Sequence, residues 1–298
     1  MIRFHEQIAP GLQYAYEAAL LASEKSAFQL IEVYEHPAFG RVLVLDGLVQ
    51  TSERDEFPYH EMLTHVPMIA HAEPRRVLII GGGDGGTLRH VLMHPSVERA
   101  VMVEIDQRVT ELCREFMPSI SGEAWNDARA EVRFDDGIAF VRDTDEQFDV
   151  ILVDSSDPVG PGEGLFTPAF YADAKARLAP GGILAAQSGS PFFQQDELHR
   201  TYKNASSVFG DEVRIYQSHT PTYPGCLWTF ALCAGSPGTV DEARKRARAR
   251  HISARYWTPE LMRGAFDLNG IARAVIAPDG PPNTWGSSPG EEDRRALS

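Results

Sequence analysis

Hydrophobic and polar positions follow one period at the start of the chain and another further on. Up to about residue 58, short β-rich runs are bounded by turn residues, and Asp46-Gly47 is typical of a hairpin turn. The segment 11–22 fits a strand and a helix equally well. From Glu56, apolar side chains recur every three or four residues as far as Ala70, which predicts an amphipathic helix with Pro67 near its end. The strands predicted before this helix are residues 28–34, 41–45 and 48–51.

Beyond residue 75, short apolar runs alternate with segments of helical period. The predicted strands are residues 76–80, 100–103, 132–134, 148–153 and 182–186, followed by a closing pair at 213–217 and 228–233. The predicted helices are residues 87–93, 109–116, a short one around Phe140, 168–178 and 194–209. Strands and helices in this alternation predict a doubly wound parallel sheet with helices on both faces, an α/β fold that is Rossmann-like.

The expected domain organisation follows from these patterns. Residues 1–58 form a small N-terminal β-strand domain, 59–240 the Rossmann-like domain and 241–277 its helical C-terminal extension. Residues 278–298 are rich in Pro, Gly and Ser, which predicts a disordered tail.

Composition and charge narrow the function classes. The net charge of −14 argues against a general nucleic-acid binder, since phosphate affinity comes from Lys and Arg. The basic run 243–250 is therefore predicted to be a solvated helix face. The three cysteines are scattered and predict no disulfide framework. We find neither an apolar signal segment near Met1 nor a run long enough to span a membrane, so we expect a cytoplasmic protein.

A run of five glycines among six residues, 81–86, lies between a predicted strand and a predicted helix. Glycines let the backbone turn sharply and approach a ligand closely. The remaining residue, Asp84, would repel a pyrophosphate, and the loop has no following Lys-Ser/Thr for nucleotide phosphates. The loop therefore favours an adenosine ligand without phosphates and with a positive charge near Asp84, on a fold of the class I methyltransferase type.

Acidic residues follow three of the predicted strands. Glu104 ends the second strand about 20 residues beyond the loop, where an acid accepts from ribose hydroxyls. Asp135-Asp136-Gly137 follows the third strand, where contact with the adenine edge is expected. Asp154 and Asp157 follow the fourth and fit base chemistry or the binding of a cation. Because ligands bind at the carboxyl ends of parallel strands, these residues are expected to share one crevice.

These segments, in this order, resemble the spermidine synthases, the polyamine aminopropyltransferases. The segments are residues 59–62, 77–86, 103–106, 136–137, 154–161 and 221–225, and residues 40–56 resemble the family's N-terminal segment. The resemblance covers residues 4–235 and implies transfer of an aminopropyl group from decarboxylated S-adenosylmethionine to putrescine, without a cofactor. It also implies a homodimer or homotetramer.

The resemblance further implies which residues bind each substrate. Asp154 would be the catalytic proton acceptor. The donor, through its methylthioadenosine part, would be bound by Gln29, Gly81, Gly83, Glu104, Asp136, Gly137 and Pro161. The polyamine would be bound by Gln50, Tyr59, His60, Asp84, Asp154, Asp157 and Tyr223, with Asp84 on the donor's aminopropyl ammonium.

Other functions remain open at this stage. The acceptor could be cadaverine, agmatine or spermidine, and a putrescine N-methyltransferase would use the same scaffold with intact S-adenosylmethionine. A non-catalytic binder of polyamines and an NAD oxidoreductase fit the acidic residues less well. His60 and His65 nearly form a zinc-protease motif, but at i and i+5 they lie about 140° apart on a helix, so we predict no metal site.

Overall fold

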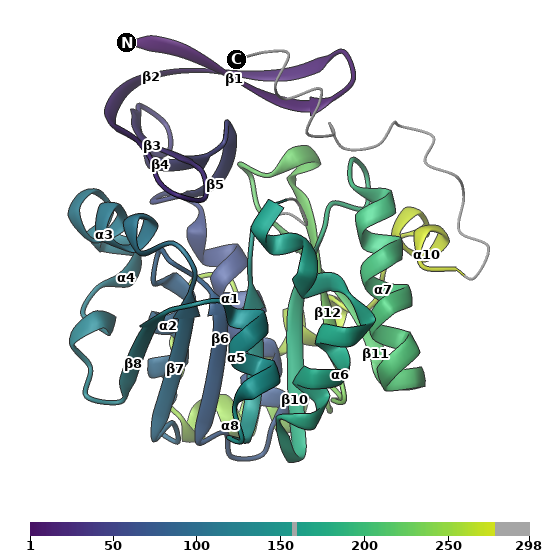
Figure 1. Ribbon diagram of the computed structural model, residues 1–298. Coiled ribbons are helices and arrows are strands. Elements are labelled where there is room, and N and C mark those ends of the chain that lie inside the picture. The colour runs from purple at the N-terminus through teal and green to yellow at the C-terminus, as the bar shows by residue number, and fades with distance from the viewer. Residues whose placement is uncertain (157–159, 278–298) are drawn as a thin grey trace.

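The computed structural model describes residues 1–156 and 160–277, and Figure 1 shows two sheets stacked one above the other. The upper, N-terminal sheet has five antiparallel strands in chain order. They are β1 (Ile2–Ala9), β2 (Leu12–Lys25), β3 (Leu30–His36), β4 (Gly40–Leu45) and β5 (Leu48–Ser52). The ambiguous segment 11–22 is thus a strand, paired on both sides and with Tyr16 and Ala18 buried between exposed neighbours.

The lower, central sheet has seven strands in the order β11-β12-β10-β9-β6-β7-β8. They are β6 (Arg76–Gly81), β7 (Arg99–Glu104), β8 (Ala130–Phe134), β9 (Phe148–Asp154), β10 (Leu178–Gly189), β11 (Val213–His219) and β12 (Leu227–Cys233). Neighbours from β8 to β10 pair in parallel, but β12 is antiparallel to both β10 and β11. The predicted Rossmann-like fold is confirmed, with a mixed sheet rather than a wholly parallel one.

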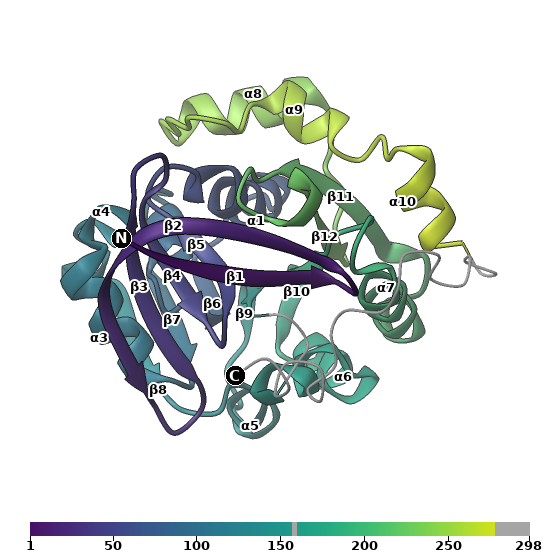
Figure 2. The ribbon, with the colours of Figure 1, turned by 90° about the horizontal axis from the view of Figure 1, so that it is seen from above.

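Helices cover both faces of the central sheet because its strands are apolar on both sides. Val77 and Ile79 of β6 pack into one core with four helices, α1 (Glu56–Ala70), α2 (Gly86–Leu92), α8 (Val240–Ala249) and α9 (Pro259–Gly264). Leu78 and Ile80 pack into the opposite core with α5 (Gly137–Asp143), α6 (Pro168–Ala176), α7 (Gln195–Phe209) and α10 (Gly270–Val275). Figure 2 shows α8, α9 and α10 following one another along one side of the molecule.

A third core joins the two sheets. Ile31, Val33 and Leu43 of the N-terminal sheet pack against Val109 and Leu112 of α3 (Gln107–Phe116). The short helix α4 (Pro118–Ser121) continues this contact. The remaining helical turns are η1 (Ala124–Asn126), η2 (Gly160–Phe166), η3 (Gly210–Glu212) and η4 (Pro224–Cys226). The N-terminal sheet is thereby fixed above the carboxyl ends of the central strands.

β6 and β9 are parallel neighbours, and the order of the strands changes direction between them: β7 and β8 follow on one side of β6, β9 and β10 on the other. Open α/β sheets bind ligands at such a topological switch point. The last paired residues of these two strands are Gly81 and Asp154. The predicted glycine loop and the predicted base therefore lie side by side at this switch point.

The basic run 243–250 has a structural role that the sequence did not predict. Arg246 donates to the carbonyls of Ile69 and Ala70 at 2.8 and 2.6 Å, where α1 ends without a basic residue of its own. Arg250 is buried and donates to Met68, His71 and Ala72. The prediction of a solvated face is wrong for these two arginines, although Lys245 and Arg248 are exposed.

Two further expectations concern the C-terminal segment and membrane-spanning helices. The predicted tail 278–298 lies outside the described residues. Within the described part, we find no helix that is long and apolar enough to cross a membrane.

Candidate active site

A cavity of about 1020 Å³ lies between the N-terminal sheet and the carboxyl ends of β6, β7 and β9. Its wall on the N-terminal side includes Gln7, Phe28 and Leu43. Its floor is made of the glycine loop and the residues that follow the central strands. A cavity of this size at a topological switch point is typical of a small-molecule site.

Most of the side chains predicted from the sequence line this one cavity. They are Gln29, Gln50, Tyr59, His60, Gly81, Gly83, Asp84, Glu104, Asp136, Gly137, Asp154 and Tyr223. Asp157 lies outside the described residues, and for Pro161 only the backbone is described, within η2. The residues expected to bind the donor and those expected to bind the polyamine thus line the same cavity.

The glycine loop approaches β9 so closely that a side chain would not fit. Gly81 has a φ of 82°, and a Cβ there would lie 2.2 Å from the carbonyl oxygen of Asp154. Gly82 donates its N–H to the same carbonyl at 2.8 Å. Both glycines have left-handed backbone, which other residues adopt only with strain. This close approach holds the loop against the strand end that bears Asp154.

Asp154 is a partly buried acid with a hydroxyl partner. The Tyr59 hydroxyl donates to Oδ1 of Asp154 at 2.8 Å, and Tyr59 itself is 6% exposed. Burial raises the pKa of Asp154, the charge of His60 opposes the rise, and the charge of Asp84 adds to it. A carboxyl with a raised pKa beside a cavity fits the task of a proton acceptor.

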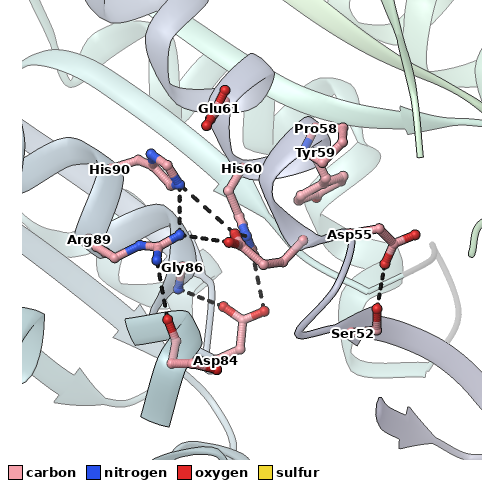
Figure 3. Close-up of polar contacts among 12 residues, drawn as sticks. Ser52, Asp55, Pro58, Tyr59, His60, Glu61, Asp84, Gly86, Arg89 and His90 are labelled. Carbon is pink, nitrogen blue, oxygen red and sulfur yellow. Dashed lines mark hydrogen bonds and ion pairs between the residues drawn. The ribbon is translucent and has the colours of Figure 1, made fainter. Parts of the chain in front are cut away.

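Asp84, on the glycine loop, and His60, on α1, face each other, as Figure 3 shows. Oδ1 of Asp84 accepts from the Gly86 N–H at 2.8 Å, and Oδ2 lies 3.3 Å from His60 Nε2. Burial alone would lower the pKa of His60, but the carboxylates of Asp84 and Glu56 raise it well above the usual value. Both ring nitrogens of His60 face carboxylate oxygens, which favours the doubly protonated ring.

Two further residues complete a chain of alternating charge. Glu56, on α1, accepts from His60 Nδ1 at 2.8 Å and from Arg89 of α2 at 2.8 Å. Burial favours neutral Glu56, but the hydrogen bonds and charges of its partners lower its pKa. The sequence analysis missed both residues, although Glu56 stands four positions before His60 on one helix face.

Glu104, the last residue of β7, and Asp136, which follows β8, line the same cavity. Burial raises the pKa of Glu104 to about 7, although its Oε1 accepts from the Asp106 N–H at 2.9 Å. Asp136 begins α5, where its Oδ1 accepts from the N–H groups of Ile138 and Ala139. Glu104 thus has a pKa near neutrality, whereas Asp136 caps a helix at the cavity wall.

Two buried acids that the sequence analysis did not single out position predicted residues. Asp106 accepts from the Gln29 amide at 3.0 Å and so ties the N-terminal sheet to α3. Asp55 accepts from the Thr222 N–H at 2.7 Å, next to Tyr223, whose hydroxyl donates to the carbonyl of Gln50. These contacts join residues far apart in sequence, so no local pattern indicates them.

The site as a whole suits a cationic ligand. Its carboxylates outnumber its cations, and its walls hold both apolar and hydrogen-bonding groups. Among residues 1–156 and 160–277, no cluster of three or more His, Cys, Asp and Glu side chains could hold a metal ion. The groups that are present can bind amines, accept a proton and hydrogen-bond a ribose.

Comparison with known proteins identifies the family. Residues 56–243 match the model of the spermine/spermidine synthase domain, and residues 3–53 match that of the spermidine synthase tetramerisation domain. The chain is 46% identical over 260 residues to a polyamine aminopropyltransferase of Pectobacterium atrosepticum, covering 86% of this chain and 90% of that protein. A Serratia proteamaculans protein of the same name is 45% identical over 260 residues, with coverage of 86% and 90%.

Solved structures similar to this chain belong to the same family as the sequence matches. A spermidine synthase in complex with the transition-state analogue AdoDATO has a TM-score of 0.87 and 34% identity, covering 92% of this chain and 94% of that one. The spermidine synthase of Thermotoga maritima has a TM-score of 0.84 and 33% identity, with the same coverage. The chain therefore belongs to the spermine/spermidine synthase family of polyamine aminopropyltransferases, and it is a transferase.

Proposed function

We propose that this enzyme transfers the aminopropyl group of decarboxylated S-adenosylmethionine to putrescine and releases spermidine and methylthioadenosine. The observation that carries the proposal is that four acids line one cavity at the glycine loop and the strand ends around it: Asp84, Glu104, Asp136 and Asp154. A relative of known structure was solved with AdoDATO, which supports an adenosyl donor here.

The donor would lie across the glycine loop. Glu104 would accept from the ribose hydroxyls and Asp136 would face the adenine, while Gly81, Gly83 and Gly137 leave room for close approach. Gln29 and Pro161 would complete this half of the site. Asp84 would hold the aminopropyl ammonium, and its negative charge would disfavour intact S-adenosylmethionine, which has a carboxylate at that end.

The acceptor diamine would lie along Gln50, Tyr59, His60 and Tyr223, with Asp154 at its reacting amine. Asp157, because of its position in the sequence three residues after Asp154, would also bind the diamine. An alkyl ammonium with a pKa near 10.4 costs about 4.6 kcal/mol to deprotonate at pH 7. The sulfonium of the bound donor would lower the pKa of this amine, and Asp154 would take its proton.

The reaction would be an in-line displacement. The amine nitrogen forms a bond to the methylene carbon beside the sulfonium as the carbon–sulfur bond breaks, and methylthioadenosine leaves as a neutral molecule. Because the leaving group is already activated, the protein contributes mainly positioning, which can be worth roughly 7–11 kcal/mol. The starting ammonium loses one proton to Asp154 before the attack, and the positive charge of the sulfonium ends on the nitrogen of the product, so charge and atoms balance.

The N-terminal region supports a homo-oligomeric assembly, a dimer or a tetramer. Residues 3–53 match a model described as a tetramerisation domain. The same region has exposed apolar side chains, including Leu12, Leu20 and Leu21, at 38%, 42% and 36% exposure. Sizing with multi-angle light scattering tests this directly, and a monomer would refute it.

Mass spectrometry of the product tests the proposed reaction. The enzyme receives putrescine with either decarboxylated or intact S-adenosylmethionine, and the Asp154→Asn variant is the blank. A product that gains an aminopropyl group, with release of methylthioadenosine, supports the proposal. A methylated product with S-adenosylhomocysteine would indicate an N-methyltransferase instead. If aminopropyl transfer occurs only with cadaverine, agmatine or spermidine, putrescine is not the acceptor, but the assignment of the donor and of the transferred group remains valid.

A further inference from the structure

Both oxygens of the Asp84 carboxylate have partners in the protein. Oδ1 accepts from the Gly86 N–H, and Oδ2 faces His60 Nε2 at 3.3 Å. The backbone partner is fixed by the loop, but the histidine is a side chain that can rotate and change its protonation. The orientation of Asp84 in the cavity therefore depends on the state of His60.

His60 lies between two carboxylates. Its Nδ1 is 2.8 Å from Oε2 of Glu56, and its Nε2 faces Asp84. An ionised carboxylate only accepts hydrogen bonds, so a ring nitrogen that faces one must carry a proton. With a carboxylate on each side, the ring has to be doubly protonated to satisfy both. The imidazole lies directly against Gly86 at the end of the glycine loop, since a Cβ there would lie 2.3 Å from a ring carbon.

Glu56 is itself held in place and charged. Its other oxygen, Oε1, accepts from Arg89 at 2.8 Å, and its side chain is only 4% exposed. Glu56 does not line the cavity, whereas His60 and Asp84 do. A bound substrate would therefore contact His60 and Asp84 rather than Glu56 itself.

We propose that Glu56, oriented by Arg89, is a positioning residue for aminopropyl transfer: it keeps His60 doubly protonated, and His60 in turn fixes the ionised carboxylate of Asp84. The part that concerns catalysis rests on the proposed function, in which Asp84 binds the donor's ammonium. The charged and titratable groups that face His60 are Glu56 and Tyr59 on its own helix, Asp84 on the loop, Arg89 and His90 on α2, and Asp154 on β9.

The first test needs no substrate. The ring nitrogens of ¹⁵N-histidine-labelled enzyme are followed by NMR from pH 6 to 8.5, and a His60→Gln spectrum assigns the His60 signal. The wild-type ring should stay doubly protonated throughout. In Glu56→Gln, which keeps the shape but removes the charge, it should lose its proton within this range. A wild-type ring that titrates near pH 6.5, or a variant ring that does not titrate, overturns the proposal.

The second test is kinetic and uses decarboxylated S-adenosylmethionine with putrescine. For Glu56→Gln, kcat/KM for the donor should fall about tenfold at pH 8, where a neutral ring no longer fixes Asp84, and should recover toward the wild-type value at pH 6. A loss of the same size at both pH values would indicate a merely structural role and overturn the proposal, as would no loss at all.

Glu61→Gln is the matched control. Glu61 is a glutamate on the same helix, 1% exposed, but its carboxylate accepts from the N–H groups of Arg255, Tyr256 and Trp257. Its variant should lower the unfolding temperature without making kcat/KM depend on pH in this way. If wild-type enzyme fails to use this donor, the proposed function fails, whereas the NMR result still decides the role of Glu56.

Discussion

The Tyr59 hydroxyl donates a 2.8 Å hydrogen bond to Oδ1 of Asp154 and joins helix α1 to the end of strand β9. This bond favours the ionised form of Asp154, whose pKa is raised by burial. In Tyr59→Phe we expect the pKa of Asp154 to rise further. The acid limb of the kcat profile should then move to higher pH by about one unit. An acid limb at the wild-type pH would show that this bond does not affect the ionisation of Asp154.

Glu104 predicts a pH dependence of donor binding. Its pKa is raised by burial to about 7, and only the carboxylate can accept from both ribose hydroxyls. The ionised fraction falls as the pH drops through this value, so binding should weaken from pH 8 to pH 6, by about tenfold. Calorimetry with methylthioadenosine, which carries no ammonium, isolates this effect. Binding to Glu104→Gln should be weak at every pH, and a wild-type affinity independent of pH would contradict the assignment.

The negative charge of Asp84 leads us to expect that decarboxylated S-adenosylmethionine binds more tightly than the intact form. Intact S-adenosylmethionine would bring a carboxylate toward Asp84, and like charges disfavour binding. In Asp84→Asn the ratio of the dissociation constants of intact and decarboxylated donor should shrink by about tenfold, or roughly 1.4 kcal/mol. Competition binding against methylthioadenosine measures both constants. An unchanged ratio would mean that discrimination arises elsewhere in the cavity.

The parts of the fold that were predictable have local signals. The strands that end at Gly81, Glu104 and Asp154 are buried on both sides, so each is a short apolar run that ends in a glycine or an acid. Because parallel strands end at one edge, the pattern also predicted that these residues share a cavity. The strand β2 gave no such signal, since most of its side chains are at least partly exposed on both sides.

The contacts that were not predictable depend on packing between distant segments. Glu56 and His60 have a visible helical spacing, but their meeting with Asp84 and Arg89 requires α1 to pack on α2. The link from Asp106 to Gln29 likewise requires the N-terminal sheet to dock on α3. A contact between two distant residues leaves no periodic pattern in the sequence. The role of such residues can be predicted from the sequence only through resemblance to a known family.

A substitution at Gly86 tests the close packing of the His60 ring against this glycine. Alanine there would place a Cβ at 2.3, 2.4 and 2.7 Å from three ring atoms of His60. The ring must move, so Gly86→Ala should cost about 1–3 kcal/mol of unfolding free energy and reduce activity. Gly264→Ala is the control, since a Cβ there meets no atom within 4 Å, and it should stabilise by less than about 1 kcal/mol. Equal urea midpoints for the two variants would contradict the packing argument.

Arg250 tests whether the basic run 243–250 serves the fold. Its guanidinium donates to the carbonyls of Met68, His71 and Ala72 at the end of α1, and it is 8% exposed. Arg250→Met keeps the apolar stem but leaves these carbonyls without their charged donor, which should cost about 1–3 kcal/mol in urea unfolding. Arg248→Met, at an exposed position in the last turn of α8, should change stability by less than about 0.5 kcal/mol. If both variants unfold at the wild-type urea concentration, the buried contacts contribute nothing. Equal losses in the two variants would instead point to the overall charge of the helix rather than to the end of α1.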